Sequence, residues 1–385
     1  MNNEKVLLIG TGATAAPILT AIRDMGFFVG VIGGKKNDIC HKLADASHVL
    51  DYSDPKSVES VFLNEKYNYI VPSCNDESYF SGSHVASKYN LPGYDSIENT
   101  KIIQNKKFFR EKVQNFSSHS PRFQVLFKGE EFNDELHLPL IVKPSESDTG
   151  KGIKIILDKS LMSSAIKNAK KASRDGQAIL EEFFTGSLHS VSIFFDNLKP
   201  KFIFFVDEYC TDYEFAVNES NFPSSISSSL QNKIVNEICF VFEELKLVDG
   251  LLHVQVLIEK DHFIIVEAMR RSPGDLYGTL IEMGSGFEYC AAYVTKFVGG
   301  DFSQKAAFKN RFISRQTLTA MGSKILNKLS FITKGRVKEI LPLHSNGSEL
   351  EDFPNDKQGI VFIEYDSKID MYAEAGSLKS LNFVE

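Results

Sequence analysis

The stretch Leu138–Gly152, LPLIVKPSESDTGKG, indicates the fold more clearly than any other part of the sequence. It begins as a short apolar strand that ends at Lys143 and continues as a loop of small polar residues with two glycines. A lysine at the end of a strand can neutralise phosphate oxygens, and the backbone N–H groups of such a loop can close over them. The Walker pattern GxxxxGK[ST] is absent, and clusters of this composition are often plain turns. The stretch alone leaves both interpretations open.

The composition is that of a soluble globular protein, with 385 residues, 43% hydrophobic residues and a formal net charge of −7. This length suffices for two or three domains. The acidic balance argues against a nucleic-acid surface, and no apolar run reaches the 18 residues of a membrane span. Five scattered cysteines without a CxxC pair and an N-terminus without a signal peptide predict a cytoplasmic protein with reduced thiols.

Residues 1–95 predict a small α/β domain. Val6–Gly10 is a continuous apolar run, typical of a strand buried in a parallel sheet, and Gly10–Ala15 follows it as a G-x-G-x-x-A turn before a helix. This turn favours dinucleotide binding only if an acidic ribose anchor follows the second strand, Phe27–Ile32, and none does. We therefore expect a Rossmann-like domain whose glycine turn is structural.

The next segment predicts a basic helix, followed by a small unit of strands and one helix. Asn99–Val113 reads as one helix with a dense basic face, which is typical of a solvated surface. Beyond it, residues 122–190 predict a strand–loop–strand–helix–strand unit. Its strands are expected at 121–127, 139–143, 153–157 and 178–184, with the helix between Asp158 and Gly176.

Two neighbouring strands, Leu251–Glu259 and Phe263–Arg271, carry polar side chains on alternate positions. A three-residue loop, Lys260–His262, would place Gln255 directly across from Glu267. Cross-strand Cβ atoms lie about 5 Å apart, close enough for two oxygen donors to share Mg²⁺. The alternative is a half-buried hairpin whose polar face meets solvent. The apolar face of the second strand is expected to hold Ile264, Val266 and Ala268.

The order of these features resembles the ATP-grasp superfamily, in its carbamoyl-phosphate synthase and biotin carboxylase-like branch. The resemblance covers residues 1 to about 310 and implies an α/β protein, with α+β grasp lobes. It places a Rossmann-like pre-ATP-grasp domain at 1–95, the main lobe at 96–121 and 191–310, and a lid subdomain at 122–190. Residues 311–385, with strands expected at 311–317, 335–341, 359–365 and 379–385, resemble the β-rich C-terminal lobe of amino-acid ligases.

The resemblance also implies a role for individual residues. Lys106 and Lys143 match the lysines that contact the phosphates of ATP, and Arg271 matches the arginine that steadies the reacting phosphate or carbonyl. The loop that folds over the phosphates corresponds to residues 145–152, including Ser145, Thr149, Gly150, Lys151 and Gly152. The adenine hinge corresponds to Glu181, Glu182, Phe183 and Phe184, with Glu181 near the amino group. The metal-bridging positions correspond to Gln255 and Glu267.

Two positions depart from the family pattern. Met269 stands where an asparagine usually binds the second Mg²⁺, and a thioether is a poor ligand for that ion. We expect His253, across from Met269, or Asp275 to replace it directly or through water. Leu188 stands where a glutamate often holds the ribose, and we expect the adjacent His189 to take that role.

The implied function is that of an ATP-dependent carboxylate–amine ligase. A substrate carboxylate would attack the γ-phosphate, and the acyl phosphate would react with an amine to give an amide or peptide, ADP and phosphate. The implied cofactors are ATP and Mg²⁺, with Mn²⁺ as a substitute, and a homodimer is expected by analogy. The alternatives are a bicarbonate-using carboxylase or carbamoyl-forming enzyme, a non-catalytic nucleotide-binding protein, and, more distantly, a dehydrogenase.

Overall fold

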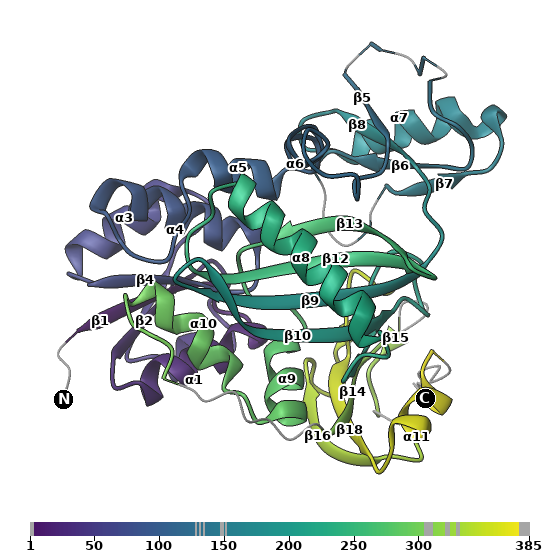
Figure 1. The fold of residues 1–385 in the computed structure, drawn as a ribbon. Coiled ribbons are helices and arrows are strands. Elements are labelled where there is room, and N and C mark those ends of the chain that lie inside the picture. The colour runs from purple at the N-terminus through teal and green to yellow at the C-terminus, as the bar shows by residue number, and fades with distance from the viewer. Residues whose placement is uncertain are drawn as a thin grey trace.

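The computed structural model describes residues 4–127, 129–130, 132–133, 135–146, 150, 152–303, 311–319, 324–328 and 332–376. Within these ranges the chain forms three main sheets, shown in Figure 1. No helix in the described ranges is long and apolar enough to cross a membrane.

The N-terminal sheet is parallel and has the strand order β3-β2-β1-β4. Its strands are β1 (Lys5–Ile9), β2 (Phe28–Gly33), β3 (Ala46–Val49) and β4 (Tyr69–Pro72). Its helices are α1 (Ala16–Asp24), α2 (Ile39–Leu43), α3 (Pro55–Asn64) and α4 (Asp76–Tyr89), with the 3₁₀ turn η1 (Ala13–Ala15) before α1. The apolar run of β1 is fully buried, as a central parallel strand requires.

Packing explains why the turn after β1 contains glycine. Gly10 has φ +108°, and a Cβ at this position would lie 2.1 Å from the hydroxyl oxygen of Ser73, next to the end of β4. Thr11 in the same turn packs so tightly against Gly33 that a Cβ there would meet its hydroxyl oxygen at 2.0 Å. The turn therefore needs small residues for close backbone approach, with no nucleotide required.

A second, smaller sheet has the order β5-β8-β6-β7, and we call it and its helix the lid after the prediction for residues 122–190. Its elements are β5 (Phe123–Leu126), β6 (Leu140–Pro144), β7 (Lys154–Ile156), the 3₁₀ turn η2 (Lys159–Leu161), α7 (Met162–Ala172) and β8 (Ala178–Glu182). The lid has its own hydrophobic core, in which Ala165 and Ala169 of α7 pack against Leu140, Val142 and Leu180 of the sheet. In Figure 1 it stands apart from the rest of the molecule, beyond the end of α6.

The central sheet has eight antiparallel strands in the order β13-β12-β9-β10-β11-β14-β18-β16. The strands of its first half are β9 (Ser187–Asp196), β10 (Lys199–Tyr209), β11 (Glu219–Phe222), β12 (Gly250–Glu259) and β13 (His262–Met269). The others are β14 (Phe312–Leu318), β16 (Arg336–Pro342) and β18 (Gly359–Tyr365), while β15 (Lys324–Ile325) pairs with β17 (Glu349–Leu350). The C-terminal strands therefore extend the central sheet, and the strand expected at 379–385 lies outside the described residues.

Helices cover both faces of the central sheet (Figure 1). On one face, α8 (Ser228–Glu244) packs Ile234, Ile238 and Phe242 against Ile193, Phe195 and Val254. The other face meets α9 (Tyr277–Ser285), α10 (Tyr289–Phe297) and the N-terminal sheet in one continuous core. The short helix α11 (Lys368–Glu374) contacts β14 and β18.

The predicted basic helix is two helices, α5 (Ile97–Gln104) and α6 (Lys106–Val113), so the expectation of one helix was wrong. Asn105 separates them, and its side-chain oxygen accepts a hydrogen bond from the N–H of Phe108, as an N-cap does. The amide nitrogen of Asn105 donates to Glu146 in the lid at 2.7 Å. The break therefore starts a new helix beside the lid.

Candidate active site

A cavity of about 890 Å³ lies where the four parts of the chain meet. The N-terminal domain contributes Cys74–Glu77, the lid and the central sheet contribute most of the walls, and the C-terminal segment contributes Phe353, Pro354 and Lys357. Ten residues predicted from the sequence line it: Lys106, Lys143, Gly150, Glu181, Phe183, Phe184, His189, Gln255, Glu267 and Arg271.

Of the other predicted residues, Asp275 also lines the cavity, and the rest lie elsewhere or outside the described ranges. Ser145 is buried and bonds to Ser173 and Asp175 inside the lid. Gly152 packs tightly against Ala172 and Pro144, and Glu182 forms an outward ion pair with Arg122. The structure thus does not place Ser145, Gly152 or Glu182 among the residues that line the cavity. Thr149 and Lys151 are among the residues that it does not describe.

A buried carboxylate holds two cations at the junction of α6 and the lid. Glu181 accepts hydrogen bonds from Lys143 at 2.6 Å and from Arg110 at 2.8 Å. Burial alone would raise the pKa of Glu181, but the two positive charges outweigh it and lower this pKa to about 2. Two cations against one carboxylate leave a net positive charge at the cavity wall. The carboxylate of Glu181 is thus bound by Arg110 and Lys143.

The β12–β13 hairpin brings Gln255 and Glu267 together as predicted, by an unpredicted route. The turn has two residues, because Glu259 pairs with His262, and a bulge between Ile265 and Glu267 then shifts the register by one. The two changes cancel, so Gln255 still pairs with Glu267.

The bulge also changes the faces of β13. Phe263, Ile265 and Ala268 belong to the core, while Val266 lines the cavity, so the expected apolar face of Ile264, Val266 and Ala268 was wrong. The carbonyl oxygen of Val266 accepts a hydrogen bond from Arg110 at 2.7 Å.

Hydrogen bonding orients the Gln255 amide for a cation. Its nitrogen donates to Glu208 at 2.7 Å, which leaves the side-chain oxygen as the atom that can meet a cation beside Glu267. Oxygen donors of this kind suit Mg²⁺, whose remaining ligands are commonly phosphates and water. Among the described residues, no cluster of three or more His, Cys, Asp or Glu side chains could hold a metal on its own. The pair therefore fits a cation that a nucleotide shares.

The two proposed substitutes for the missing asparagine have other partners. His253 is buried, bonds to Ser192 at 2.9 Å and is not among the residues that line the cavity. Burial lowers its pKa to about 3, so it is neutral. Asp275 lines the cavity, but its carboxylate is paired with Lys357 and lies 3.6 Å from Arg315. The structure therefore does not bring His253 to the metal position.

Arg271 joins the cavity to the N-terminal domain. Its Nε lies 2.5 Å from Asp76 at the start of α4, and both residues line the cavity. An arginine held in this way presents its remaining N–H groups in a fixed fork, which suits carboxylate or phosphate oxygens.

Sequence reasoning missed several lining residues. Arg110 was noted only as part of a basic helix face, and Asp207 and Glu208 follow the apolar part of β10 without a motif around them. Lys357 belongs to a loop far along the chain. A polar pair directly after a buried strand was the available signal for Asp207 and Glu208.

Comparison with known proteins bears on the fold and the site. Residues 103–272 match the family model of the ATP-grasp domain. A curated relative is the formate-dependent phosphoribosylglycinamide formyltransferase of a Nitratiruptor species, 26% identical over 187 residues, which are 47% of this chain and 48% of that protein. The chain thus spans about half the length of the curated relatives it matches.

Two solved structures resemble the chain over nearly its whole length. The L-amino acid ligase of Bacillus licheniformis has a TM-score of 0.82 and 15% identity, covering 97% of this chain and 96% of that one. The phosphoribosylglycinamide synthetase of Anaerococcus prevotii has a TM-score of 0.78 and 18% identity, covering 97% of both chains. Residues 103–272 therefore match an ATP-grasp domain, and the fold of the whole chain resembles the folds of these two enzymes.

Proposed function

We propose that this protein is an ATP-dependent carboxylate–amine ligase that forms an amide or peptide bond and releases ADP and phosphate. The observation that carries the proposal is the cavity, where Lys106 and Lys143 face the Gln255–Glu267 pair and Arg271. Such a cavity has cations for a triphosphate, oxygen donors for a metal and an arginine for a substrate oxyanion. The named activities of the related proteins support the same class of reaction.

Each wall of the cavity has a part in this proposal. An adenine ring suits the apolar part of the lining, which includes Ile141, Ile155, Phe183, Phe184 and Leu257. Lys106 and Lys143 neutralise the phosphates, and Gly150, which lines the same cavity, contacts them through its backbone. Gln255 and Glu267 would hold Mg²⁺ or Mn²⁺, which polarises the phosphates when bound. His189 contacts the ribose in place of the glutamate that Leu188 replaces.

The reacting carboxylate binds near Arg271, and water is excluded from the acyl phosphate by the lid. No protein nucleophile is required. Cys74 lines the cavity, but burial raises the pKa of its thiol to about 11, so it stays protonated. The homodimer implied by the family resemblance stays a prediction, as does the cytoplasmic location expected from the scattered cysteines and the N-terminus.

The test is ADP and phosphate formation from Mg-ATP with pools of amino acids, amines and small carboxylates. The pools include formate, because the curated relative is named formate-dependent. We expect release that depends on one pool and falls by about 100-fold or more in Glu267→Ala, the scale on which loss of a transition-state contact acts. The matched control is Glu259→Ala, which removes an exposed glutamate of the same hairpin and should retain the wild-type rate.

Two results would contradict the proposal. ATP binding without release from any pool would favour a non-catalytic nucleotide-binding protein, for which Met269 at the usual asparagine position is the main support. Release that requires bicarbonate and no amine would favour a carboxylase.

A further inference from the structure

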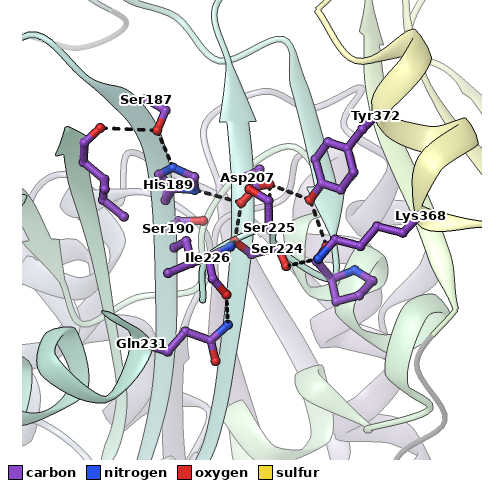
Figure 2. Close-up of polar contacts among 12 residues, drawn as sticks. Ser187, His189, Ser190, Asp207, Ser224, Ser225, Ile226, Gln231, Lys368 and Tyr372 are labelled. Carbon is purple, nitrogen blue, oxygen red and sulfur yellow. Dashed lines mark hydrogen bonds and ion pairs between the residues drawn. The ribbon is translucent and has the colours of Figure 1, made fainter. Parts of the chain in front are cut away.

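A buried network of hydrogen bonds joins helix α11 to the cavity (Figure 2). His189 Nδ1 lies 2.7 Å from the carboxylate of Asp207, and the hydroxyl of Tyr372 lies 2.5 Å from the other oxygen of that carboxylate. Tyr372 and Asp207 are 165 residues apart in the sequence. The C-terminal segment of the chain thus reaches a residue that lines the proposed nucleotide site.

Asp207 is held by donors on every side. Its oxygens accept from His189 and Ser224 on one side and from Tyr372 and the N–H of Ser225 on the other. Four donors fill the four acceptor positions of a carboxylate. Burial opposes the charge, but these bonds lower the pKa of Asp207 to about 2, so it stays ionised.

An ionised Asp207 fixes the histidine ring. Because a carboxylate only accepts, Nδ1 of His189 must carry a proton. The opposite nitrogen, Nε2, lies 2.6 Å from the hydroxyl of Ser187, and both residues line the cavity. Nε2 and the Ser187 hydroxyl are therefore the polar atoms that this network directs toward a ligand hydroxyl.

Helix α11 is itself firmly placed. Met371 is buried against Leu318 and Ile363, and Glu374 accepts hydrogen bonds at 2.8 Å from the hydroxyls of Tyr365 and Thr333. These contacts fix α11, and with it Tyr372, against strands β14 and β18 of the central sheet. At the other end of α11, Lys368 bonds to the carbonyl oxygen of Ser224 at 3.0 Å, beside Asp207.

We propose that α11 is part of the nucleotide site, with Tyr372 as a positioning residue that holds Asp207 and, through it, His189 for recognition of the ribose hydroxyls. This proposal rests on the proposed function, which places the ribose at His189. It adds a requirement that α11 completes the nucleotide site.

The test is calorimetric binding of ATP and of 2′,3′-dideoxy-ATP, with Mg²⁺, to the full chain and its variants. The wild-type chain should prefer ATP, because only ATP offers ribose hydroxyls. Tyr372→Phe should weaken ATP binding by about 10-fold, as loss of a supporting hydrogen bond commonly does, and leave dideoxy-ATP unchanged. Asp207→Asn should lose the same discrimination.

Tyr365→Phe is the matched control, because it removes a buried hydroxyl that donates to Glu374 of α11 and does not contact Asp207. It should keep the wild-type preference for ATP. A Tyr372→Phe variant with that same preference would overturn the proposal while leaving nucleotide binding intact. Equal losses in both tyrosine variants would also overturn it, since they would mean general loosening of α11. Absence of ATP binding by the wild-type chain would instead overturn the proposed function, and this proposal with it.

Discussion

Among single residues, Glu181 has a large predicted effect on stability. Its pKa of about 2 lies below the ordinary value of 4.5, so its ionised form stabilises the folded state. That contribution is complete above pH 4.5 and is lost as the pH falls toward 2. In Glu181→Gln, which leaves Arg110 and Lys143 buried without their counter-charge, the free energy of unfolding at pH 7 should fall by about 3–5 kcal/mol. Urea unfolding at several pH values should show this difference shrinking below pH 4.5.

The control is the adjacent Glu182→Gln, because Glu182 pairs with Arg122 near the surface. Exposed pairs contribute about 0–1 kcal/mol, so its effect should be small at every pH. A deficit in Glu181→Gln that persisted unchanged to pH 3 would contradict the argument. The sequence placed Lys143 and Glu181 in one site but could not show that they bond to each other, because side-chain pairing across 38 residues depends on how β6 pairs with β8.

At the scale of elements, the hairpin shows why part of the site was predictable. Alternation of polar residues predicted that Gln255 and Glu267 share a face, and this was confirmed because the short turn and the bulge cancel. The faces of Ile264 and Val266 were predicted wrongly, since a bulge inverts the alternation on one side of it. The break between α5 and α6 was also missed, because the pattern of charged residues does not indicate that Asn105 is an N-cap.

Gly150 offers a test of how tightly the cavity wall packs beside Phe215. Gly150 has φ +71°, and a Cβ there would lie 2.6 Å from the Cβ of Phe215 and 2.8 Å from its carbonyl oxygen. Overpacking of this kind costs about 1–3 kcal/mol, so Gly150→Ala should raise the Kd for ATP by about 10-fold. Gly176→Ala is the control, because Gly176 has φ +70° in the same lid but no atom within 4 Å. Equal ATP affinities in the two variants would contradict a role for this contact.

At the scale of the whole molecule, sequence patterns predicted the separate parts of the chain better than the way these parts pack and pair with one another. The C-terminal strands were expected as a lobe, yet β14, β16 and β18 continue the central sheet, because pairing between strands distant in the chain leaves no local signal. The same sheet shares one continuous core with the N-terminal domain. The chain should therefore unfold these two parts together.

A buried ion pair between the N-terminal domain and the end of β13 tests whether the N-terminal domain and the central sheet unfold together. Arg270 and Asp95 lie 2.7 Å apart, with side chains only 2% and 0% exposed, and the hydroxyl of Tyr79 donates to the same carboxylate. Asp95→Asn leaves the arginine charge uncompensated and should cost about 3–5 kcal/mol. Because the core is shared, calorimetry should show one transition of the N-terminal domain and central sheet at lower temperature. Arg174→Gln, which removes an exposed pair with Glu77, should change little. A separate early transition of the N-terminal domain in Asp95→Asn would mean that this pair, and not the shared core, joins the two parts.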